Sequence, residues 1–100
     1  MKKASSKWSV LGLMSGSSLD GLDICHVEFS LQNHDQSFAI QSLKTYAYPK
    51  ELVDRLAKAS VASARDVFLL DAALGRFFAQ SVESHLQKEG IGNLDLIASH

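Results

Sequence analysis

The sequence is poor in the residues that mark several classes of protein. Its single cysteine, Cys25, excludes an internal disulfide framework and argues against a cysteine-based zinc site. The formal net charge is only −1 at pH 7, so no excess of positive charge attracts nucleic acid or an anionic membrane surface. These absences favour a protein of the reducing cytoplasm that binds neither nucleic acid nor membrane.

Long hydrophobic runs are also missing. No stretch approaches the roughly 20 apolar residues that a membrane helix needs. The start, Met1-Lys2-Lys3 followed by the apolar residues 8–14, faintly resembles a secretory signal, but Ser9 and Gly12 interrupt the apolar run. We therefore interpret 8–14 as a buried strand and 1–7 as a disordered polar terminus.

The first half of the chain has the pattern of strands. Residues 22–31 alternate, and 38–48 carry threonine and tyrosine, which suit a pleated surface. With 8–14 they form three strands whose short links predict an antiparallel meander. On the second strand, the apolar face consists of Cys25, Val27, Phe29 and Leu31. Cys25 is then inert core, and His26 on the other face is solvated.

Helical spacing replaces the strand pattern at the single proline, Pro49, which can begin a helix over 49–59. Ser63 is an N-cap candidate with Asp66 three residues later, and a second helix is predicted over 63–89. Its Phe77 and Phe78, together with Trp8, are expected in the core. His85 lies near the helix end, where a cation suits the helix dipole.

The last residues, 93–99, begin a fourth strand, which the right-handed crossover rule places parallel to an earlier one. Sheets with parallel strands are normally covered on both faces, and these elements supply one cover only. We therefore expect residues 8–100 to form part of a longer protein.

The segment 12–23, GLMSGSSLDGLD, is the stretch that suggests chemistry. It predicts a strand, a loop of glycines and hydroxyl residues, and a second strand. Successive N–H groups in such a loop can bind an anion, and Gly16 and Gly21 allow unusual backbone angles. Asp20 or Asp23 can hold magnesium through its waters. It is neither a Walker loop nor a dinucleotide fingerprint, and an ordinary hairpin remains an alternative.

The same segment resembles the N-terminal signature of anhydro-N-acetylmuramic acid kinases, GLMSGTSLDG followed by a small apolar residue and Asp. Ser17 stands where that family usually has threonine, so the hydroxyl is retained. The ending 96–100, LIASH, resembles the family's strand that leads into Ser-His-Gly-Gln-Thr.

The resemblance implies an α/β fold of the actin-like ATPase superfamily, with two ribonuclease-H-like lobes and ATP between them. It implies hydrolysis of the anhydro bridge of the sugar and ATP-dependent phosphorylation to N-acetylmuramic acid 6-phosphate, in recycling of the bacterial cell wall. ATP and Mg²⁺ are the expected cofactors, the small sugar is the substrate, and a homodimer of the full-length enzyme is compatible with it.

The resemblance also assigns site residues. The family's catalytic aspartate lies downstream of His100, so no catalytic residue is assigned in this chain. His100 borders the sugar pocket, and Asp20 contacts the metal through water, whereas the role of Asp23 stays open between magnesium and a turn. The residues expected to bind ATP are Gly16, Ser17, Ser18, Leu19, Asp20, Gly21, Leu22 and Asp23.

Two other functions remain open. The chain can belong to an actin-like lobe that binds nucleotide but serves regulation or assembly, or it can be a structural fragment whose loop binds nothing. A downstream catalytic aspartate and a second phosphate loop would separate the kinase from the regulatory lobe.

Overall fold

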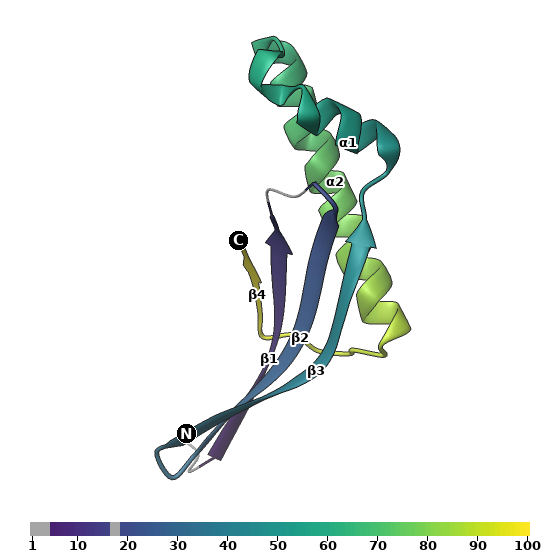
Figure 1. Ribbon diagram of the computed structural model, residues 1–100. Coiled ribbons are helices and arrows are strands. Elements are labelled where there is room, and N and C mark those ends of the chain that lie inside the picture. Colours follow the sequence, from purple (N-terminus) through teal and green to yellow (C-terminus); the bar gives the residue numbers. More distant parts are fainter. Residues whose placement is uncertain (1–4, 17–18) are drawn as a thin grey trace.

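The computed structural model describes residues 5–16 and 19–100. It forms one sheet with its helices gathered on one side (Figure 1). The elements in order are β1 (Ser5–Ser15), β2 (Gly21–Gln32), β3 (Asp35–Ala47), α1 (Lys50–Ala57), the short 3-10 helix η1 (Ala59–Val61), α2 (Ala64–Lys88) and β4 (Leu96–Ser99).

The sheet has the topology that the sequence predicts. Its strand order is β3-β2-β1-β4, with β1, β2 and β3 antiparallel and β4 parallel to β1. The α/β fold expected for the opening of a ribonuclease-H-like lobe is therefore confirmed. The first strand begins earlier than predicted, at Ser5, and residues 1–4 lie outside the described part of the chain.

Local signals explain where the helices begin and end. Pro49 occupies the N-cap position of α1, and the N–H of Asp66 donates to Ser63 Oγ at 3.1 Å at the start of α2. Gly90, with φ +65°, follows the end of α2 and takes the left-handed backbone that glycine tolerates. Both predicted helices are confirmed to within two residues at each end, whereas η1 was not predicted. No helix in the described part of the chain is long and apolar enough to cross a membrane.

The core lies between α2 and one face of the sheet. Leu11, Leu22 and Ile24 are fully buried there, and Phe77 and Phe78 of α2 pack against this cluster as predicted. The opposite face, which we call the helix-free face, is covered by no described helix (Figure 1).

Three burial predictions were wrong because they placed the core on the helix-free face. Leu22 and Ile24 are in phase with His26, so α2 covers that set and leaves Cys25 half-buried and Phe29 43% exposed. Trp8 lies opposite Phe29 and is 42% exposed. His26 is not solvated: it is half-buried, and its Nε2 hydrogen-bonds Ser9 Oγ at 2.7 Å.

His85 also differs from its predicted role. Its side chain is fully buried, with Nδ1 2.9 Å from the Tyr46 hydroxyl and Nε2 2.9 Å from Ser42 Oγ. Burial lowers the pKa of His85, because an imidazolium would lose its hydration there. The buried ring is therefore neutral near pH 7 and joins α2 to β3, in place of acting as a cation on the helix dipole.

Candidate functional site

The two motifs of the sequence meet at one edge of the sheet. Because β1 and β4 are parallel neighbours, their carboxyl ends lie side by side. The N–H of His100 donates to the carbonyl oxygen of Leu13 at 2.9 Å, and the N–H of Ser15 donates to the carbonyl oxygen of His100 at 3.4 Å. Ligands of open α/β sheets bind at this edge, beyond the carboxyl ends of the strands.

The connection between β1 and β2 leaves from this edge. Two of the predicted ATP-binding residues, Ser17 and Ser18, lie outside the described residues. Of the remainder, Leu19 has φ +61°, a left-handed backbone that is uncommon for a residue with a side chain. The carbonyl oxygen of Asp20 accepts from the N–H of Tyr48 at 3.2 Å, which ties the end of the connection to the residue after β3.

Gly21 is needed for a different reason than the one predicted. Its backbone is not among the positive-φ conformations. A Cβ atom at this position would instead lie 2.9 Å from the carbonyl carbon of Tyr46 and closer still to its oxygen. Only glycine therefore lets β2 begin directly against the backbone of β3.

The two residues that follow point to opposite faces of the sheet. The side chain of Leu22 is fully buried in the core, so only its backbone remains for a ligand. Asp23 is exposed on the helix-free face, and its Oδ1 accepts a hydrogen bond from Thr45 Oγ1 at 2.5 Å. Asp20 is exposed as well. Within the described ranges, no three His, Cys, Asp or Glu side chains gather closely enough to hold a metal ion by themselves.

A hollow of about 370 Å³ on the helix-free face connects these features. Asp23, Ser99 and His100 line it together with apolar residues that include Met14, Cys25 and Leu43. The hollow therefore brings together His100 and the last residue of the predicted ATP-binding stretch, from opposite ends of the sequence.

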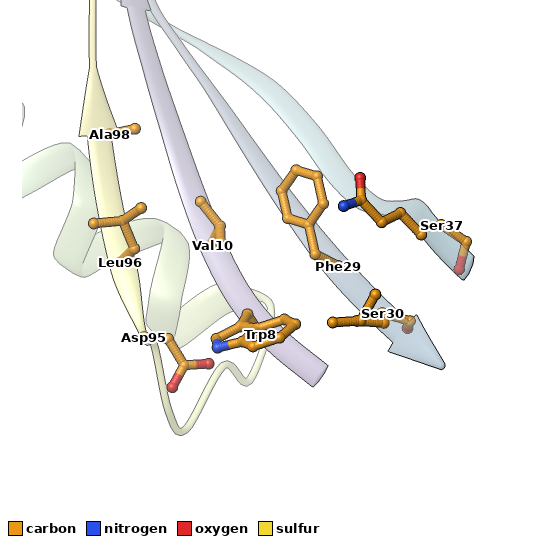
Figure 2. A pocket seen from close by; sticks show the side chains of 10 residues that line it. Trp8, Val10, Phe29, Ser30, Ser37, Asp95, Leu96 and Ala98 are labelled. Carbon is orange, nitrogen blue, oxygen red and sulfur yellow. The ribbon is translucent and has the colours of Figure 1, made fainter. Parts of the chain in front are cut away.

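A larger hollow of about 790 Å³ lies farther along the same sheet (Figure 2). Figure 2 shows Trp8, Val10, Phe29 and Leu96 around it, with Asp95 at its rim. The carboxylate of Asp95 already accepts from the N–H of Ser9 at 2.7 Å. The larger hollow contains none of the predicted site residues, whereas the smaller one is lined by Asp23 and His100, so the smaller hollow is the better candidate site.

The sequence did not single out Thr45. Its only visible property was suitability for a strand. The contact with Asp23 depends on the pairing of β2 with β3, and this pairing shifts by one residue between His26 and Val27. No count along the sequence reveals such a bulge.

Comparison with known proteins agrees with the resemblance. The sequence profile of the anhydro-N-acetylmuramic acid kinase family matches residues 8–100. Anhydro-N-acetylmuramic acid kinase of Synechococcus elongatus is 36% identical over an alignment of 94 residues, which covers 91% of this chain and 24% of that protein.

Two further relatives carry the same name. The Shewanella loihica protein is 33% identical over 96 residues, covering 93% of this chain and 25% of its own length. The Clostridioides difficile protein is 35% identical over 95 residues, covering 90% of this chain and 25% of its own length. The chain thus spans about a quarter of the length of the relatives it matches. With a family match that takes in both the 12–23 segment and the His100 end, the chain belongs to the anhydro-N-acetylmuramic acid kinase family.

Proposed function

We propose that this chain is the N-terminal part of a two-lobe, ATP-dependent kinase that acts on anhydro-N-acetylmuramic acid. Family membership and the one-quarter coverage of the relatives support it. The observation that carries it is the pair of backbone hydrogen bonds that join His100 to Leu13 and Ser15. They put the predicted sugar-facing residue next to the predicted phosphate loop, as transfer of a phosphoryl group between two ligands requires.

In the proposed reaction, water opens the anhydro bridge and the γ-phosphoryl group of ATP passes to the sugar oxygen at C6. The products are N-acetylmuramic acid 6-phosphate and ADP. This chemistry would serve recycling of cell-wall sugars in the cytoplasm. We expect the aspartate that activates this water to lie downstream of His100 in the full-length sequence. We assign no general base within this chain.

The proposed roles of the chain's own residues follow from the composition of the 12–23 segment and from the family resemblance. N–H groups of residues 16–22 and the hydroxyls of Ser17 and Ser18 bind phosphate oxygens. The exposed carboxylate of Asp20 fits a hydrated magnesium ion, because magnesium keeps several waters and needs few protein ligands. Bound magnesium would neutralise charge on the phosphates. His100 borders the sugar.

The test is a coupled assay of ADP release by the full-length enzyme with magnesium and ATP. The anhydro sugar is compared with N-acetylmuramic acid, which lacks the bridge. We expect ADP release that depends on the anhydro sugar, together with a 6-phosphate product detected by mass spectrometry. ADP release that is equal with and without either sugar would contradict the kinase and favour the regulatory lobe.

A further inference from the structure

One side-chain contact at the candidate site has no counterpart in the roles assigned so far. Thr45 of β3 lies directly opposite Asp23 of β2 in the register of the sheet. Its Oγ1 donates to Asp23 Oδ1 at 2.5 Å. An ionised carboxylate can only accept, so the threonine hydroxyl must be the donor.

The backbone holds the two partners in place. Leu22, next to Asp23, is fully buried in the core. At Gly21, β2 lies so close to the backbone of Tyr46 that position 21 has no room for a side chain. Tyr46 is the neighbour of Thr45 in β3. The hydroxyl therefore faces the carboxylate across the paired strands, and its hydrogen bond to Oδ1 restrains the orientation of the carboxylate.

The alternative is an ordinary cross-strand pair, which would stabilise the hairpin slightly and do nothing else. The place of Asp23 argues for more. It ends the predicted ATP-binding stretch, it is exposed, and it lines the same hollow as Ser99 and His100. In the described part of the chain, Thr45 is the one hydrogen-bond partner recorded for its carboxylate.

We propose that Thr45 is a positioning residue for nucleotide binding, which holds the Asp23 carboxylate toward the hollow so that Asp23 contacts magnesium–ATP through water. The inference rests on the proposed function. It assigns to Asp23 the magnesium-facing role that the sequence left open, and to Thr45 the task of orienting it. Loss of a partner that orients a direct metal ligand commonly changes metal affinity by about 10- to 100-fold, and for a carboxylate that acts through water we expect the lower end of that range.

The test measures binding and needs no turnover. The full-length enzyme is titrated with the ATP analogue that has an imido group between its β and γ phosphorus atoms, with magnesium and with EDTA. Thr45→Val should raise the dissociation constant about 10-fold with magnesium. Thr45→Ser, which keeps the hydroxyl, should bind like the wild type. With EDTA, all three proteins should bind equally.

A double-mutant cycle separates positioning from a purely structural role. If Thr45 acts through Asp23, the Thr45→Val, Asp23→Asn double variant should bind magnesium–analogue no more weakly than Asp23→Asn alone. Thr45→Ala, which removes the same hydroxyl at this exposed position, serves if the valine variant does not fold.

The outcomes are distinct. Wild-type affinity in Thr45→Val or Thr45→Ala, or additive losses in the cycle, would overturn the inference while leaving the proposed function intact. A wild-type enzyme that does not bind the analogue would overturn the proposed function, and this inference with it.

Discussion

The N–H of His100 donates to the carbonyl oxygen of Leu13 at 2.9 Å, and this bond joins the last residue of the chain to the strand that leads into the glycine-serine connection. The bond exists because the crossover through α2 returns the chain parallel to β1. Two sequence motifs from opposite ends of the chain thus share one edge of the sheet, which is where the proposed site lies.

The close approach at Gly21 predicts a strong effect of a single methyl group. In Gly21→Ala, the new Cβ would overlap the carbonyl group of Tyr46. We expect the free energy of unfolding to fall by about 2 kcal/mol, because backbone cannot move aside as a flexible side chain can. Urea unfolding followed by circular dichroism measures this.

Gly12→Ala is the matched control, since its Cβ would meet only the carbonyl oxygen of Cys25 at an ordinary 3.8 Å. We expect a change within about 0.5 kcal/mol. Equal destabilisation by the two substitutions would show that the contact with Tyr46 is not what requires glycine at position 21.

The buried histidine predicts a pH dependence of stability. Burial lowers the pKa of His85 in the folded protein; Lys44, Lys88 and His26 act in the same direction, and Glu89 opposes them. The neutral ring is therefore favoured by folding. Its contribution is complete above the unfolded pKa of about 6.5 and is lost as the pH falls from there toward the lower folded pKa.

We expect the free energy of unfolding of the wild type to decrease from pH 7.5 toward pH 5 more steeply than that of His85→Gln. Urea titrations at several pH values measure the difference. His34→Gln, at an exposed turn position, is the control for the loss of a histidine outside the core. A gap between wild type and His85→Gln that is constant over this range would show that His85 does not titrate differently in the two states.

Residues 1–100, expressed on their own, are predicted not to turn over the sugar. Phosphoryl transfer depends on positioning and on charge stabilisation around the transferred group. By our proposal, residues 1–100 supply one phosphate loop but neither the second lobe nor the aspartate that activates water. We expect no sugar-dependent ADP release from this segment. Turnover near that of the full-length enzyme would mean that catalysis is built from these residues alone.

The features that the sequence predicted correctly depend on residues that are close together in the sequence. The Ser63 cap with Asp66 and the stop at Gly90 are local signals, and both are present in the structure. The covered face of β2 was predicted wrongly because both faces are apolar: Leu22 and Ile24 are in one phase, and Val27 and Phe29 in the other. Which face α2 covers is decided by packing between distant segments.

The residues of the candidate site also fall into those that the sequence predicted and those that depend on contacts between distant segments. The 12–23 segment was recognised from its own residues, and His100 from its resemblance to the family. Thr45 and the hydroxyl partners of His85 could not be found, because the contact at Thr45 requires the exact pairing of β2 with β3. The contacts of His85 with Ser42 and Tyr46 require the packing of α2 on the sheet.

The central claim is that the loop of the 12–23 segment binds the phosphates of ATP, and Ser17 tests it most directly. Titration calorimetry with magnesium–ATP compares full-length wild type, Ser17→Thr and Ser17→Val. We predict wild-type affinity for Ser17→Thr, which keeps the hydroxyl and adds a methyl group. We predict about 10-fold weaker binding for Ser17→Val, which has the shape of the threonine variant but carries a methyl group in place of the hydroxyl. Equal affinity of Ser17→Val and the wild type would contradict the account, because the hydroxyl would then make no contact with the nucleotide.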